Sequence, residues 1–160
     1  MLISYISLAK TSFTIEIWLK PTSFPNTIDH AIFGLCPSIN THQCLHLTIR
    51  KISTNYYLYF GFYLNDCQGN TSIGSNQWFH AVFVFDMNTM KQSIYFDGKL
   101  DNQCSASAPF LASSGDITIG TIPLQIPAVG LNFYNVSFFC FCIKNALLMI
   151  VGMYRVIWII

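Results

Sequence analysis

Apolar and polar residues alternate along much of this chain with a period of two, the spacing of a β-strand that is buried on one face. The clearest case is residues 13–19, where every second residue is apolar until Pro21 ends the pattern. No stretch before residue 137 has the period of an amphipathic helix. Together with a short apolar run at 31–35 and an aromatic, β-prone stretch at 56–63, the pattern predicts strands at residues 13–19, 31–35, 45–50, 56–63, 78–85, 93–96, 116–120 and 134–139.

The strongest local signal lies in the middle of the chain, where two expected strands meet a turn sequence. The first of these strands opens on Trp78 and ends on Asp86, and the second runs into Asp97-Gly98. Asp-Gly between strands is typical of a tight β-hairpin, and hairpins build antiparallel sheets. We therefore expect one all-β domain, a two-sheet antiparallel sandwich, without internal repeats.

The last part of the chain departs from this pattern. From residue 138 to 160 almost every residue is apolar, apart from Lys144, Asn145 and Arg155. We therefore divide the chain into a sandwich domain, residues 1–139, and an apolar tail, residues 140–160. Three interpretations of the tail stay open: an aberrant, read-through or frame-shifted end that replaces the final strands, a membrane segment, or ordinary core.

Composition limits the classes of partner. Hydrophobic residues make up 52% of the chain and aromatic residues 16%, whereas charged residues make up only 9%, against about 25% in an ordinary domain. The eight lysines and arginines are scattered, and the net charge is +1. This distribution argues against nucleic acid as a partner, because nucleic-acid recognition requires a basic patch.

Six cysteines point to an oxidising compartment. Cys36 and Cys44 flank a short polar loop, and Cys67 and Cys104 lie on either side of the central hairpin strands. We predict the disulfides Cys36–Cys44 and Cys67–Cys104. The chain-entropy model makes the second worth roughly 4 kcal/mol and the first about 1 kcal/mol less.

Two N-glycosylation sequons agree with such a compartment. One begins at Asn70, in a polar turn, and the other at Asn135, in an expected strand, so Asn70 is the better acceptor. Residues 1–9 are apolar but lack the basic start of a signal peptide. We therefore expect an extracellular or cell-surface module whose export signal lies in a missing N-terminus or in a longer parent chain.

Taken together, several segments resemble laminin G-like domains of the concanavalin A-like jelly-roll superfamily. The match covers about residues 13–139 and lacks the final helical turn and last strand of the family, which leaves a sheet edge unpaired. The resemblance rests on FTIEIWLKP at 13–21, QWFH at 77–80, VFD at 84–86, IYFDG at 94–98, DITIG at 116–120 and YNVSFF at 134–139.

The resemblance implies a jelly roll of two curved antiparallel sheets. It also implies binding of glycans, matrix proteins or adhesion receptors through loops at the rim of the sandwich, in some relatives with calcium. Our main hypothesis is therefore a non-catalytic extracellular recognition module. The alternatives are a membrane-anchored form of this module through residues 138–160, a glycoside hydrolase relative, and a truncated product without a stable fold.

The carboxylates argue against the hydrolase. A retaining glucanase needs two carboxylates about 5 Å apart. Glu16 is the single glutamate of the chain, and a glycine turn separates Asp97 from Asp101. No serine or cysteine nucleophile with an orienting acid accompanies His80, so we interpret His80, like Trp78, as a packed, hydrogen-bonded core residue.

Two kinds of metal site have candidate ligands. Cys36, His42, Cys44 and His46 offer four zinc ligands, but a disulfide explains the two cysteines better. Calcium requires several oxygen ligands. Its candidates are aspartates near expected strand ends, whose spacing forms no loop motif: Asp29, Asp66, Asp86, Asp101 and Asp116.

Trp18 is the binding residue that the pattern suggests. It alternates with Ile17 and Leu19 and therefore lies on the opposite face from the Phe13 stripe. On that face it either covers a second layer or stands on an open sheet surface, where a sugar ring can stack on it.

Overall fold

The fold is built entirely from strands within the part of the chain that the computed structural model describes, residues 2–3, 6–24, 29–120, 122, 131–132, 136–145 and 149–152. This confirms the predicted all-β class. The strands are β1 (Leu2–Ile3), β2 (Phe13–Pro21), β3 (Asp29–Leu35), β4 (Leu45–Ile52), β5 (Asn55–Gly61), β6 (Asp66–Gln68), β7 (Phe79–Asp86), β8 (Lys91–Phe96), β9 (Lys99–Ser105), β10 (Ile117–Ile119), β11 (Leu131–Asn132), β12 (Val136–Asn145) and β13 (Met149–Gly152).

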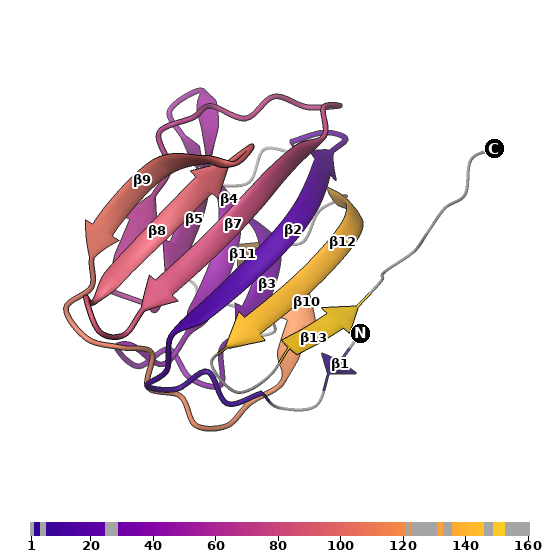
Figure 1. The fold of residues 1–160 in the computed structure, drawn as a ribbon. Coiled ribbons are helices and arrows are strands. Elements are labelled where there is room, and N and C mark those ends of the chain that lie inside the picture. Colours follow the sequence, from indigo (N-terminus) through magenta and orange to yellow (C-terminus); the bar gives the residue numbers. More distant parts are fainter. Residues whose placement is uncertain are drawn as a thin grey trace.

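The strands form two sheets packed face to face (Figure 1). A seven-stranded sheet has the order β1-β10-β3-β4-β5-β6, with β11 pairing in parallel with β3. A six-stranded sheet has the order β13-β12-β2-β7-β8-β9. The chain passes repeatedly from one sheet to the other, and this interleaving confirms the jelly-roll sandwich.

The core lies between the two sheets, where the inward side chains of facing strands interdigitate. In β2, Phe13, Ile15, Ile17 and Leu19 are all buried, as their period-two spacing predicts. Aromatic rings from both sheets meet there; the Phe13 ring lies 6.2 Å from Phe60 of the opposite sheet. Burial of such large rings supplies most of the driving force for folding.

The Asp97-Gly98 hairpin forms as expected between β8 and β9. Both turn residues have positive φ, 47° for Asp97 and 76° for Gly98, the conformation of a two-residue hairpin turn that matches the strand twist. The Asp97 carboxylate also accepts a hydrogen bond of 2.8 Å from the backbone amide of His80 in the neighbouring strand. Strand β9 itself was not predicted, because its residues are mostly polar and exposed.

Two disulfides join the cysteine pairs that the sequence favours. Cys36 and Cys44 close the loop between β3 and β4. Cys67 lies in β6 and Cys104 in β9, so their disulfide joins the last strand of one sheet to the last strand of the other. Around it, the Asn102 side chain donates a 2.7 Å hydrogen bond to the backbone carbonyl of Gln68 across the same seam.

The C-terminal part of the chain contributes two strands to the six-stranded sheet. β12 pairs with β2 and runs to Asn145, past the boundary at residue 139 that we drew from the sequence, and β13 pairs with β12. Within the described residues, no helix is long and apolar enough to cross a bilayer. The other tail residues, 146–148 and 153–160, lie outside the described residues, as does Asn135, the acceptor of the second sequon.

Candidate functional site

The outer surface of the six-stranded sheet carries a group of side chains that we call the aromatic face, formed by Glu16, Trp18, Trp78 and His80. Trp18 and His80 are register partners on β2 and β7, and their rings lie 4.9 Å apart between centroids. The His80 Nε2–H donates a 2.9 Å hydrogen bond to the Glu16 carboxylate. The carboxylate thus fixes the imidazole against the indole, and Trp18 remains 42% exposed.

Trp78 extends this surface at the start of β7. It immediately precedes the strand and is 45% exposed. It stands two residues before His80 and, like His80, outside the buried inward row of β7 that begins at Phe79. Two exposed tryptophans beside an imidazole and a carboxylate form a surface that offers both stacking and hydrogen bonding.

An irregularity in β12 lies directly beside Trp18. The register of β12 with β2 passes from Phe138–Leu19 to Phe141–Ile17, so two residues of β12 lie opposite the single residue Trp18. Such bulges bend a strand and often occur next to binding sites, where they redirect the neighbouring side chain.

These observations correct two of our predictions. The prediction that His80 and Trp78 pack in the core is wrong, because both belong to the outer face, although His80 is hydrogen-bonded as predicted. The inward positions of β7 are Phe79, Ala81 and Phe83, all buried. Apolar residues occupy every inward position of β7, so His80 falls on an outward position.

The outer surface of the seven-stranded sheet carries a second polar cluster, the charged face, on strands β3 to β6. Its centre is Asp29, which is fully buried and accepts hydrogen bonds from Arg50 Nε (2.7 Å) and Nη2 (2.9 Å) and from Thr48 Oγ1 (3.2 Å). The Arg50 guanidinium lies over the Tyr59 ring, 3.5 Å from its centroid, a cation–π contact. The Tyr59 hydroxyl in turn donates to Asp66 at 3.4 Å.

His46 completes the charged face. Its Nδ1 lies 2.9 Å from the backbone carbonyl of Cys44, which can only accept, so Nδ1 carries the proton. Its Nε2 lies 3.7 Å from the Asp66 carboxylate. Both side chains occupy the space above Gly61, where any Cβ would collide with them.

Burial and charge shift the pKa values of this cluster in different directions. Burial lowers the pKa of His46, and the charge of the more exposed Asp66 only partly opposes this shift, because solvent screens that carboxylate. Burial also pulls down the pKa of Arg50, but the hydrogen bonds and charge of Asp29 outweigh it and raise that pKa. Burial, helped by Asp66, raises the pKa of Tyr59.

Of the five aspartates that are candidates for calcium, the structure brings only two into one cluster. Asp29 and Asp66 belong to the charged face, while Asp86 holds the turn after β7 by accepting hydrogen bonds from Asn88 N and Thr89 Oγ1. Within the described residues, no three histidine, cysteine, aspartate or glutamate side chains are grouped to hold a metal ion. The zinc alternative loses Cys36 and Cys44 to their disulfide.

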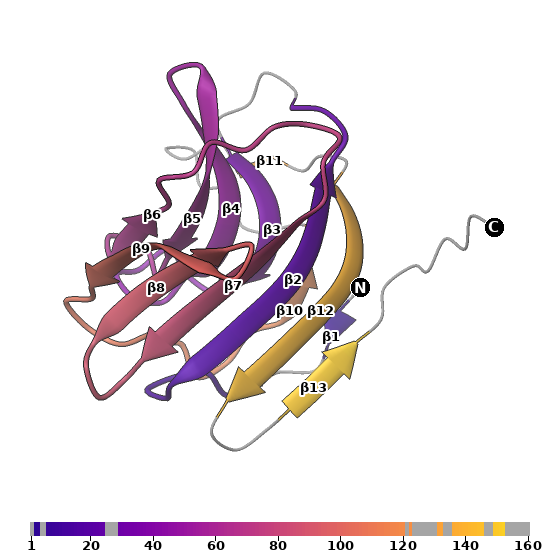
Figure 2. The same cartoon turned by 45° about the horizontal axis from the view of Figure 1, so that its top comes forward.

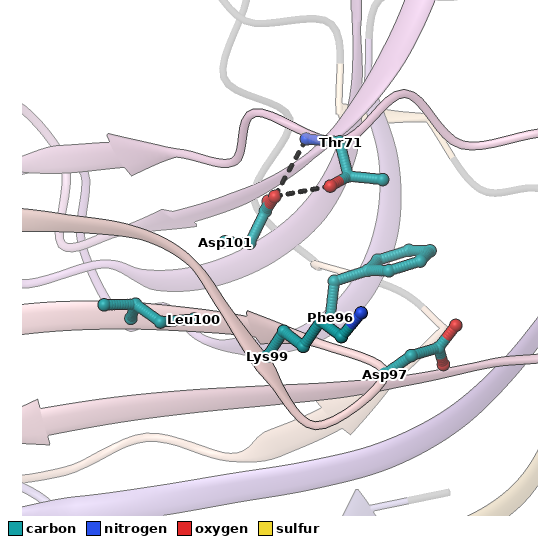
Figure 3. A pocket seen from close by; sticks show the side chains of 6 residues that line it. All are labelled: Thr71, Phe96, Asp97, Lys99, Leu100 and Asp101. Carbon is teal, nitrogen blue, oxygen red and sulfur yellow. Dashed lines mark hydrogen bonds between the residues drawn. The ribbon is translucent and has the colours of Figure 1, made fainter.

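A pocket of about 380 Å³ lies at the rim of the sandwich, beside the β8–β9 hairpin. It is lined by Thr71, Phe96, Asp97, Lys99, Leu100 and Asp101 (Figure 3). The Asp101 carboxylate accepts hydrogen bonds from the backbone amide (2.9 Å) and the hydroxyl (2.6 Å) of Thr71. The pocket thus joins a rigid polar wall to the partly apolar hairpin.

The sequence did not single out Arg50 or Tyr59. The signal was nevertheless present, because His46, Thr48 and Arg50 occupy the polar positions between Leu45, Leu47 and Ile49. Three side chains that can hydrogen-bond, in an outward row on one central strand, indicate a polar cluster rather than an ordinary solvated sheet surface. The pattern does not give the order of strands in the sheet. It therefore could not show that Asp29, Tyr59 and Asp66 lie beside that row.

Solved structures with this fold include several binding modules. A candidate carbohydrate-binding protein from Bacteroides ovatus superposes with a TM-score of 0.67 and 19% identity, over 89% of this chain and 39% of that protein. The sialidase CBM40 module of Ruminococcus gnavus, solved with α2,3-sialyllactose, gives 0.60 and 14% identity over 81% and 76%. Mouse laminin α1 domains LG4-5 give 0.60 and 10% identity over 94% and 39%.

This chain thus spans about two fifths of the Bacteroides and laminin structures. At these identities the likeness establishes the fold alone. No curated protein matches the chain. The family model described as the concanavalin A-like lectin/glucanases superfamily matches residues 2–130, most of the sequence, and the chain therefore belongs to that family.

Proposed function

We propose that this chain is a non-catalytic recognition module that works outside the cell and binds glycan on the aromatic face. The observation that carries the proposal is Trp18, whose indole is 42% exposed on a sheet surface and is braced by the His80–Glu16 pair. Sugar rings present an apolar C–H face that packs on aromatic rings and hydroxyls that bond to carboxylate and imidazole groups. The aromatic face offers all three.

The contact of the Trp18 indole with His80 favours a role in binding, which exposure alone would not indicate. A tryptophan held by a neighbouring ring loses little conformational freedom when a ligand stacks on it, and preorganisation of this kind raises affinity. The placement differs from the expected rim loops, because Trp18, which carries the proposal, lies within strand β2 rather than on a loop that joins two strands.

The absence of catalysis in this proposal rests on the carboxylates. On the aromatic face Glu16 is bonded to His80 rather than facing a second carboxylate, and a retaining mechanism needs two. The two disulfides support an oxidising compartment. Glycan-binding structural neighbours support the ligand class, and the laminin neighbour keeps a matrix-protein ligand as the second candidate.

The experiment uses the full chain with both disulfides formed, probed on an array of glycans and matrix proteins with calcium and with chelator. We expect glycan binding that Trp18→Ala weakens by about 30-fold, which corresponds to about 2 kcal/mol at a buried aromatic contact. Leu64→Ala, at an exposed apolar residue in the turn between β5 and β6, is the matched control and should bind normally.

Three outcomes would count against the proposal. Glycan binding that Trp18→Ala leaves intact would move the site away from the aromatic face. Binding to matrix proteins alone would replace the glycan by the second candidate ligand. Cleavage of the bound glycan, lost in Glu16→Gln, would contradict the non-catalytic assignment.

A further inference from the structure

The turn that contains Asn70 presents a sequon in an accessible and well-defined conformation. Asn70, Thr71 and Ser72 form a bend between β6 and β7, and both Asn70 and Ser72 are exposed. An asparagine in an exposed bend leaves room for an attached glycan in the folded domain, unlike one in the middle of a paired strand.

Asp101 of β9 holds this bend against the opposite sheet. Its carboxylate accepts a 2.9 Å hydrogen bond from the backbone amide of Asn70, in addition to the two bonds from Thr71. Asn70 Nδ2 donates a 2.7 Å hydrogen bond to the backbone carbonyl of Asp101. Gly69 permits this approach, because a Cβ there would collide with the Asp101 carboxylate.

The nitrogen that would carry a sugar therefore lies beside the rim pocket. Asp101 and Thr71 line that pocket, together with Phe96, Lys99 and Leu100 from the hairpin, and Figure 3 shows the bonded Asp101–Thr71 pair next to them. Leu100 is 54% exposed. A pocket with apolar and hydrogen-bonding walls suits a sugar ring, which has both kinds of surface.

We propose that Asn70 carries an N-linked glycan and that its first N-acetylhexosamine ring occupies the rim pocket. In the transfer, Nδ2 of Asn70 bonds to C1 of an oligosaccharide carried on a polyprenyl diphosphate. The bond from C1 to the diphosphate oxygen breaks, the polyprenyl diphosphate leaves, and the transferring enzyme takes the amide proton. One N–H remains on Nδ2, and it can keep the hydrogen bond to the Asp101 carbonyl.

The proposal is independent of glycan binding by the aromatic face, since its tests measure mass and thermal stability. It shares with the disulfides the premise of passage through an oxidising secretory compartment. In that compartment the sugar is added before the chain folds, so the bond to Asp101 forms around a sugar that is already attached.

The first test measures the intact mass of the full chain secreted from eukaryotic cells. To isolate Asn70, the second sequon is removed with Asn135→Gln. We expect one glycan on this variant and none when Ser72→Ala is added, because Ser72 supplies the sequon hydroxyl and lies outside the pocket lining. A folded, secreted Asn135→Gln protein with unmodified Asn70 would overturn the proposal.

The second test asks whether the first ring occupies the pocket. An endoglycosidase trims the glycan of the Asn135→Gln protein to one sugar, and its unfolding temperature is compared with that of the Ser72→Ala form, which keeps an unmodified asparagine. We expect the one-sugar form to unfold about 2–4 °C higher, as a contact of modest strength gives in a domain of this size.

The matched variant Lys99→Ala/Leu100→Ala removes two exposed pocket side chains without touching the core. In this background the advantage of the single sugar should disappear. Equal unfolding temperatures for the one-sugar and sugar-free forms in the unaltered pocket would overturn the placement of the ring, whatever the mass shows.

Discussion

Asp29 and Arg50 form the ion pair at the centre of the charged face, and the stability of the fold depends on it. Asp29 is fully buried, and two of its hydrogen bonds come from Arg50. Arg50→Met leaves the carboxylate buried without a countercharge, so we expect a loss of about 3–5 kcal/mol in the free energy of unfolding, measured by urea titration.

The double variant Asp29→Leu/Arg50→Met separates charge from packing. It removes both ions and fills their volume with apolar groups, so it should lose clearly less than the single variant. A double variant as unstable as Arg50→Met alone would show that the pair contributes shape rather than charge compensation.

His46 makes the stability of the fold depend on pH. Burial lowers its pKa in the folded state, whereas the unfolded chain has a pKa of about 6.5. Between these two pKa values the unfolded state binds more protons than the folded state. The contribution of His46 to the free energy of unfolding is therefore fully present above about pH 6.5 and decreases as the pH falls toward the folded pKa. Burial lowers the pKa of His30 as well, and it acts in the same direction.

This dependence is measurable as the urea midpoint at pH 7.5 and pH 5.5. We expect a lower midpoint at pH 5.5 and a smaller difference in His46→Asn, whose amide can still donate to the Cys44 carbonyl. Asp86, whose pKa its Thr89 hydrogen bond lowers, titrates below this window. An equal pH difference in wild type and His46→Asn would contradict the assignment.

At the scale of the element, a substitution in the β8–β9 turn measures the energetic cost of backbone strain without a change in packing. Gly98 has a φ of 76°, and nothing lies within 4 Å of a Cβ added there. Gly98→Ala should therefore cost about 1–2 kcal/mol from the left-handed backbone alone, visible in thermal unfolding. Gly74→Ala is the matched control, because its site is also open but its φ is not positive; a similar loss there would refute the argument.

The elements that the sequence predicted most clearly are those with alternating apolar residues. β2, β4 and β7 were found because their inward rows are continuous, and the Asp97-Gly98 turn fixed the hairpin. β9 escaped because an edge strand needs few apolar residues, and polar side chains protect such an edge from pairing with other chains.

The candidate sites were predictable only where one strand carries the evidence. Trp18 could be placed on the outer surface because its own neighbours alternate with it. His80 and Trp78 were misplaced, because a run of apolar residues on both parities permits two registers. The charged face required the order β3-β4-β5-β6, a property of the assembled sheet that no local pattern contains.

At the scale of the whole molecule, the two disulfides should contribute unequally. Cys67–Cys104 spans 37 residues and Cys36–Cys44 spans 8. In the chain-entropy model, Cys67→Ala/Cys104→Ala should cost about 4 kcal/mol and Cys36→Ala/Cys44→Ala about 1 kcal/mol less. Guanidinium unfolding of the two double variants tests this, and a larger loss for the shorter loop would contradict the model.

The position of the Cys67–Cys104 bridge also determines how the sandwich can open. It joins β6 to β9 at one margin of the two sheets, whereas neither β1 nor β13, the strands at the opposite margin, contains a cysteine (Figure 2). The edge strands of the two sheets are therefore linked covalently at the β6–β9 margin and not at the β1–β13 margin, which we call the free margin. Its transient openings should begin at the free margin, and backbone amides of β10 and β12 should exchange with deuterium before those of β5 and β8.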